Sequence, residues 1–145
     1  MAEDRNFEQH PEDEAETAAR LAGSVAEALD RESFDEARVL VAGLRARDLA
    51  EVIEMLEPDQ RLALIQALGT SFDYEVLSEI DEGVRDQLSE ALPNELLARA
   101  VTQLDSDDAA YLIENLEDSD KEEILAQLDS GDREALERNL DYPEE

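Results

Sequence analysis

The chain has 145 residues, of which 42% are hydrophobic, so it is long enough to bury a core despite a formal net charge of −29. It contains no cysteine, which excludes a disulfide framework and thiolate chemistry, and no apolar run approaches the ~18–20 residues that span a bilayer. Its 41 acidic residues against 12 basic ones would repel nucleic acid and anionic lipid surfaces. With no secretory signal visible, we expect a soluble, cytosolic chain that does not insert into a membrane.

The N-terminal part of the chain predicts a polar tail followed by two helices. Residues 1–10 are polar, lack periodicity and include the only histidine, His10, so we expect a flexible acidic tail. Pro11 can open a helix over residues 11–29, and its inner stripe would comprise Ala18, Leu21, Ala22, Val25 and Leu29. Ser33 and Glu36 have the spacing of a capping box, which predicts a second helix over 34–43 with Phe34 facing inward.

Large aliphatic residues recur every twelve positions from Leu44 onward. The series comprises Leu44, Leu56, Leu68, Ile80, Leu92, Leu104, Leu116, Leu128 and Leu140. A second apolar series lies eight residues into each unit and comprises Val52, Leu64, Val76, Leu88, Ala100, Leu112, Ile124 and Leu136. One continuous helix is excluded, because twelve steps of about 100° overshoot three turns by roughly 120°. Each unit is therefore predicted to be one short helix followed by a turn.

The predicted helices of the repeat span residues 48–56, 59–68, 72–80, 84–92, 94–104, 107–116, 120–128 and 132–140. Ser119 and Glu122 form a second pair with capping-box spacing. Helices of ~8–10 residues are too short to be stable alone, so packing must stabilise them. No segment alternates long enough to predict a strand. The fold class is therefore all-α, an α-solenoid that presents a surface to a partner.

Catalysis finds little support in the sequence. His10 stands alone in the tail, no nucleophile–base pair suggests itself, and neither an HExxH motif nor a glycine-rich phosphate loop occurs. The carboxylates are too numerous for the sequence to single out an acid–base pair. We therefore expect the chain not to be an enzyme.

The large negative charge has three possible causes. The chain contains a single lysine, Lys121, and abundant acidic residues, a composition that fits solubility in high salt. The charge would equally serve cation binding or a basic partner. The sequence leaves these three causes open.

A metal site would have to be built from oxygen ligands, which favours hard cations. Residues 105–108, Asp-Ser-Asp-Asp, are the densest candidate, followed by the acidic runs 118–120 and 129–132. None has the spacing of a calcium-binding loop. The alternative is helix capping, since Asp and Ser at helix starts accept hydrogen bonds from the first amides and complement the helix dipole. Capping and ion binding are compatible.

Several motifs give the repeats a family resemblance. Leu44 to Leu56 reads Leu-x-x-x-Asp-Leu-Ala-Glu-x-x-Glu-x-Leu, and 104–110 reads Leu-Asp-Ser-Asp-Asp-Ala-Ala. Together with Leu92-Pro93-x-x-x-Leu97 and the ending Leu140-Asp-Tyr-Pro-Glu-Glu, this pattern is similar to the cytosolic N-terminal domain of MgtE-type magnesium transporters. The resemblance covers roughly residues 25–145.

The resemblance implies a right-handed superhelix of about ten short helices over residues 11–140, an MgtE N-type helical-repeat domain. It implies that 141–145 begin a linker toward a CBS pair that this chain does not contain. In the family, the domain is the cytoplasmic part of a cell-membrane protein, a homodimer with a transmembrane pore. Magnesium ions bridge acidic residues of this domain and the CBS pair and hold the pore closed.

The resemblance also implies metal ligands. The family's acidic interface positions match Glu75, Asp107 and Asp108, which would share Mg²⁺ with the CBS pair. Where a related chain can carry another Asp, this chain has Tyr111. Because Mg²⁺ keeps its water and often binds through one or two carboxylates, its affinity for the isolated domain should be weak. The alternative function is an α-helical repeat scaffold that binds a protein partner and has no metal role.

Overall fold

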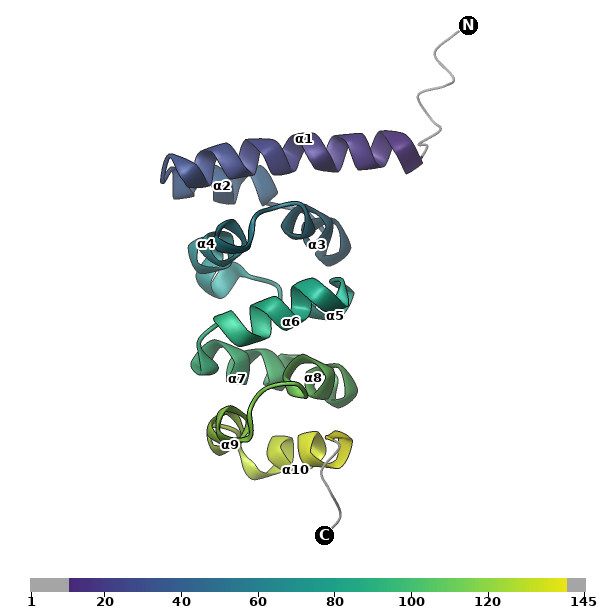
Figure 1. Cartoon of the computed structure of the whole chain (residues 1–145), viewed down its shortest axis with the longest axis vertical. Coiled ribbons are helices and arrows are strands. Elements are labelled where there is room, and N and C mark those ends of the chain that lie inside the picture. The colour runs from purple at the N-terminus through teal and green to yellow at the C-terminus, as the bar shows by residue number, and fades with distance from the viewer. Residues whose placement is uncertain (1–10, 141–145) are drawn as a thin grey trace, which may run out of the picture. The chain divides into compact units, whose positions relative to one another are not determined.

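The computed structural model describes residues 11–140, with side chains described from Glu16 onward. These residues form ten α-helices and no strand, which confirms the all-α fold class and the predicted number of helices (Figure 1). The chain divides into two compact units, Met1–Gly69 and Thr70–Glu145. The right-handed superhelical sense stays a prediction, and the predictions for 1–10 and 141–145 lie outside the described residues.

The first unit is a packed group of four helices. They are α1 (Pro11–Asp30), α2 (Phe34–Val41), α3 (Ala46–Glu54) and α4 (Pro58–Leu68). α1 packs against the other three, and α2 also packs against α4. Its fully buried apolar side chains are Val25, Ala28, Ala37, Val52, Ile53, Leu64 and Ile65.

Two arginines of the first unit close helix ends, where carbonyl groups lack partners within the helix. Arg61 of α4 donates from Nε to the Ile53 carbonyl at 2.9 Å and from Nη2 to the Glu54 carbonyl at 3.1 Å, at the end of α3. Arg38 of α2 donates from Nη1 to the Ala67 carbonyl at 3.0 Å, at the end of α4. Arg61 therefore links α4 to α3, and Arg38 links α2 to α4.

The second unit is centred on α8. It contains α5 (Val76–Glu79), α6 (Glu82–Ala91), α7 (Asn94–Gln103), α8 (Ser106–Ile113), α9 (Asp118–Ala126) and α10 (Ser130–Asn139), and a short 3-10 turn, η2 (Gly69–Ser71), lies at its start. α8 packs against α5, α6, α7 and α10, and α7 also packs against α9. The side chains at the start of α8 are therefore placed by several helices.

Both apolar series of the repeat face the interior of their units. Every member of the second series, from Val52 to Leu136, is buried. In the first series Leu44, Leu68 and Leu128 are half-buried and the remaining members are buried. The twelve-residue period therefore reports core positions, as predicted.

Most helices of the repeat end one to three residues earlier than predicted, because the leucines of the first series often lie just beyond a helix, whereas α4 ends at Leu68 as predicted. Leu92, Leu104 and Leu140 have extended backbones, with ψ of 150°, 158° and 148°, at the C-cap of α6, α7 and α10. A buried leucine therefore forms the link between consecutive helices. The following helix starts up to two residues before the predicted position, as at α9 and α10.

The predicted helix over 72–80 is wrong in extent, since α5 comprises only Val76–Glu79. The Asp73 carboxylate accepts a hydrogen bond from the Glu75 N–H at 3.0 Å, a local turn that competes with helical hydrogen bonding. Phe72, which precedes this turn, is buried. The segment before α5 therefore contributes a core residue without being helical.

Both predicted capping boxes are wrong. α9 starts at Asp118 with Glu117 as its N-cap, so Ser119 lies inside the helix. Ser33 is the N-cap of α2, but its hydroxyl donates to the Glu36 carboxylate at 3.3 Å and does not cap a backbone amide. Phe34, predicted to face inward, is 39% exposed. A capping box occurs instead at α4, where the Glu57 N–H donates to the Gln60 side chain at 2.9 Å.

Candidate metal centre at the start of α8

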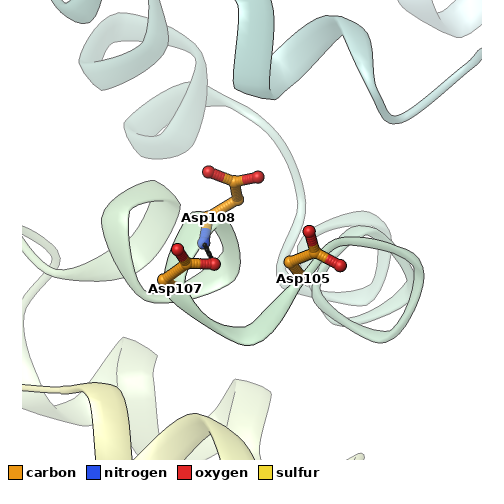
Figure 2. Close-up of side chains that lie close together, drawn as sticks. All are labelled: Asp105, Asp107 and Asp108. Atoms are coloured by element: carbon orange, nitrogen blue, oxygen red, sulfur yellow. Dashed lines mark hydrogen bonds between the residues drawn. The ribbon is translucent and has the colours of Figure 1, made fainter.

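Three aspartates meet at the start of α8. Asp105 is the N-cap residue, and Asp107 and Asp108 lie in the first turn. One carboxylate oxygen from each residue lies within 4.8 Å of the others, and Figure 2 shows the three side chains gathered around the first turn. Among the described residues, no other group of three acidic, histidine or cysteine side chains lies close enough to share an ion. We call Asp105, Asp107 and Asp108 the aspartate cluster.

The backbone that carries the aspartate cluster is fixed by packing. Ala109 and Leu112 are buried on the inner face of α8. The Ser106 hydroxyl accepts a hydrogen bond from the Asn139 amide of α10 at 3.0 Å. The outward carboxylates therefore extend from a helix start that two contacts hold in place.

Asp105 is not used as a helix cap, although it occupies the N-cap position. The corresponding residues of α6 and α10 do cap: Asp81 accepts from the Gly83 N–H at 3.0 Å, and Asp129 accepts from the Asp132 N–H at 2.9 Å. Within the cluster, Asp107 accepts from the Asp108 N–H at 3.0 Å. Capping therefore accounts for Asp129, in the acidic run 129–132, and leaves the Asp105 carboxylate without a role in the helix.

Crowding of negative charge perturbs Asp108. Partial burial raises the pKa of its carboxyl above the usual 3.8, and the nearby charges of Asp107, Asp105 and Glu79 raise it further. Glu79 is the last residue of α5, which packs against α8. Four carboxylates from two helices therefore contribute to one region of negative potential, which a cation would relieve.

Glu75 lies apart from this group. It is exposed at the N-cap of α5, and its carboxylate accepts a hydrogen bond from the Ser78 hydroxyl at 3.2 Å. The structure thus brings Asp107 and Asp108 together, as expected of ligands, and does not bring Glu75 to them. Its role as a ligand stays a prediction. Asp105 lay within the predicted acidic run, whereas nothing in the sequence singled out Glu79.

Asp120 of the acidic run 118–120 contacts the start of α7. The Asn94 amide at the start of α7 donates to the Asp120 carboxylate at 3.3 Å and to the Glu123 carboxylate at 2.8 Å. These bonds connect α7 and α9. The run therefore has a structural role in the second unit.

Tyr111 lies one turn after the cluster. Its side chain is 56% exposed, and the Arg85 guanidinium lies 5.3 Å from its ring centre. The Arg85 side chain is 14% exposed, and its Nη2 lies 3.9 Å from the Glu82 carboxylate and 3.8 Å from the Asp86 carboxylate. Because these ion pairs are long, the cation–π contact with Tyr111 adds to the stabilisation of the guanidinium. At this position the chain presents an aromatic contact in place of a carboxylate.

The chain matches a known family of transporter domains. The profile of the MgtE intracellular N domain matches residues 44–145, which include the aspartate cluster. The chain belongs to the MgtE intracellular N-domain family. This family is the N-terminal domain of magnesium transporters and not an enzyme family. A search of curated proteins gave no match.

The MgtE family match begins at Leu44, so α1 and α2 precede the matched region. Among the described residues, no helix has both the length and the apolar character needed to cross a bilayer. α3 to α10 lie within the matched region.

Proposed function

We propose that this MgtE N domain is a regulatory, magnesium-sensing domain of a homodimeric membrane transporter, and that it acts on the cytoplasmic side through contacts with a CBS pair. The observation that supports this most is the convergence of Asp105, Asp107 and Asp108, whose carboxylate oxygens lie within 4.8 Å of one another. The domain itself neither conducts ions nor catalyses a reaction.

The chemistry of the aspartate cluster fits Mg²⁺. Its donors are carboxylate oxygens only, and Mg²⁺ prefers oxygen ligands and commonly binds through one or two carboxylates with several waters. Asp105 and Asp107 are exposed and Asp108 is half-buried, so water and an opposing surface can reach all three. The raised pKa of Asp108 shows that its ionised form is disfavoured by neighbouring negative charge, and a nearby cation would stabilise that form. Asp107 and Asp108 would hold the ion, with Asp105 beside them.

The cluster would act by its charge. Without a cation, ionised Asp105, Asp107 and Asp108 repel the acidic surface of the CBS pair. A bound ion supplies the positive charge that lets two acidic surfaces approach. The packed first turn of α8 keeps the carboxylates in place, and Glu75 would make a second acidic contact from the start of α5. The domain then sits close to the CBS pair at high magnesium and moves away at low magnesium.

The test is the gating of the full-length transporter with Asp107→Asn and Asp108→Asn combined. Both side chains keep their size, so the fold should be preserved while two ligands lose their charge. We expect the magnesium concentration for half-maximal closure to rise about fivefold or more, the range of typical coupling energies. Patch-clamp recording or magnesium influx measures this concentration.

A matched control removes the same charge elsewhere in the second unit. Glu90→Gln combined with Glu134→Gln changes two exposed carboxylates outside the aspartate cluster. This control should gate like the wild type. If both double variants shifted closure equally, overall charge and not the cluster would govern gating, and unchanged gating in the Asp107/Asp108 variant would refute the site.

A further inference from the structure

A groove of about 630 Å³ lies in the first unit between α1 and the start of α3, distant in sequence from the aspartate cluster of the second unit. It is lined by Thr17, Ala18, Leu21, Leu44, Arg45, Arg47, Asp48, Glu51 and Val52. One wall belongs to α1, which precedes the region that matches the MgtE family. The groove is therefore formed where α1 meets the start of the matched region.

The floor of the groove is aliphatic and incompletely covered. Ala18 and Leu21 of α1 and Leu44 before α3 are half-buried, whereas Val52 is buried. Leu44 is the first member of the twelve-residue series, and Leu56, one unit later, is buried. The floor thus offers apolar surface that a docked side chain would remove from water, at about 25 cal/mol per Å².

Two exposed arginines lie at the rim of the groove. Arg45 is the N-cap residue of α3 and Arg47 lies in its first turn, and both are exposed. Neither guanidinium forms an ion pair or hydrogen bond with a side chain among residues 16–140. By contrast, Arg31 pairs with Glu36 at 2.7 Å. Within the described structure, both guanidinium groups therefore remain available to pair with carboxylates of a partner.

Two segments that line the groove contain no acidic residue, although Glu16 directly precedes the first of them. Acidic residues make up 41 of 145 positions, yet segments 17–26 and 37–47 contain none. These two segments supply six of the nine lining residues, including both arginines. Asp48 and Glu51 complete the rim on the side of α3. The groove lining therefore carries two basic and two acidic side chains in a molecule with a formal net charge of −29.

We propose that this groove docks an amphipathic helix of a protein partner whose apolar stripe is flanked by acidic residues. Its aliphatic side chains enter the floor, and its carboxylates pair with Arg45 and Arg47, where guanidinium–carboxylate pairs form two parallel hydrogen bonds. A uniform polyanion such as nucleic acid or an anionic membrane is disfavoured, because Asp48 and Glu51 and the net charge of −29 repel it. An amphipathic helix, unlike a uniform polyanion, can keep all its acidic residues on one flank and so avoid Asp48 and Glu51.

The experiment measures binding of a fluorescent synthetic peptide to the full chain by anisotropy. The probe is an amphipathic helix of about four turns with leucines at i, i+4 and i+7 and glutamates on one flank, and a second probe replaces the glutamates by lysines. We expect saturable binding of the acidic probe, and about tenfold weaker binding by Arg45→Glu/Arg47→Glu, because the reversal replaces two attractive charges by two that repel the glutamates.

The matched control is Arg99→Glu/Arg138→Glu, which reverses two exposed arginines of the second unit. It should bind the acidic probe within about twofold of the wild type, because neither arginine lines the groove. Circular dichroism confirms that each variant is folded.

Several results would overturn the proposal. Equal losses in both double variants would mean that a diffuse field, not the groove, attracts the probe. Preference for the lysine probe, or no saturable binding of either probe, would exclude an acidic helix. Self-association in sedimentation that is lost in Arg45→Glu/Arg47→Glu would assign the groove to a second copy of the chain. None of these results depends on magnesium, so the metal site can fail or hold independently.

Discussion

The pKa of Asp108 shows the effect of crowded negative charge at the candidate site. Partial burial and three neighbouring carboxylates raise its pKa, so the folded chain binds its proton more tightly than the unfolded chain does. The stabilising contribution is fully present below the unfolded value of about 3.8 and is lost as pH rises through the folded pKa. At neutral pH the ionised Asp108 therefore destabilises the fold unless a cation is present.

Asp108→Asn should consequently be more stable than the wild type at pH 7 in the presence of a chelator. The difference should shrink as the pH falls and vanish below about pH 3.8, where the carboxyl is protonated in both states. Urea unfolding followed by circular dichroism measures it, and Glu134→Gln controls for the loss of one negative charge. A variant that is less stable than the wild type at pH 7 would contradict the assigned charge crowding.

Asp107 and Asp108 could be predicted as a pair because they are adjacent in sequence. The unused carboxylate of Asp105 could not, because Asp105-Ser106 and Asp129-Ser130 are the same dipeptide at the same place in a helix. They differ in backbone geometry, with ψ of 151° at Asp105 and 170° at Asp129, and in the residue that follows the dipeptide, Asp107 against Gly131. Glu79 joins the group through packing of α5 on α8, which no local pattern encodes.

This difference at the residue scale leads to a prediction about caps. Asp129→Ala removes a side-chain bond to the Asp132 amide and should cost about 1 kcal/mol of stability. Asp105→Ala removes no cap bond and one repelling charge, so it should be neutral or stabilising without metal. Thermal unfolding of the two variants compares them. Equal destabilisation would show that Asp105 caps α8 in solution.

At the scale of elements, the twelve-residue period predicts the helices well, since each has to bury the same two positions. The period does not predict where a helix ends. Leu92 and Leu104 are as apolar as a helical core residue but lie in extended backbone between helices. Burial alone therefore does not distinguish the last turn of a helix from the link that follows, and the shortened α5 shows the same limit.

The stability of the second unit should depend strongly on the buried side chains of α8. Leu112 is fully buried in α8, the helix on which α5, α6, α7 and α10 pack. Leu112→Ala should cost about 2–5 kcal/mol, the range for removing a buried leucine side chain. Val39→Ala on α2, where the valine is 73% exposed, should change stability by less than about 0.5 kcal/mol. Chemical denaturation measures both, and similar small losses would mean that α8 is not central to its unit.

At the scale of the whole molecule, the sequence predicts an all-α chain of about ten helices and its family. The periodicity runs through Gly69 and Thr70 without a break, so it gives no sign of the division into two units there. The charge is uneven, because residues 70–145 carry 24 acidic residues against 5 basic ones. The unit that contains the aspartate cluster therefore experiences the stronger self-repulsion.

The dependence of the melting temperature on monovalent salt distinguishes between the possible causes of this acidity. We expect the chain to be folded at about 0.1 M KCl and its melting temperature to rise with added KCl, because salt screens repulsion between exposed charges. Calorimetry across a KCl series measures the effect. A chain that is unfolded at about 0.1 M and folds only near molar salt would show that the acidity serves salt tolerance and not ion sensing.

A magnesium titration of this chain at fixed high KCl, followed by amide NMR shifts, tests whether the aspartate cluster is a preformed part of a sensor. We expect weak, saturable shifts centred on Asp105, Asp107 and Asp108, with a second set at Glu75, and loss of the first set in Asp107→Asn/Asp108→Asn. Small, non-saturating shifts spread over all acidic helices and unchanged in the double variant would mean diffuse counterion binding and would contradict a specific magnesium site.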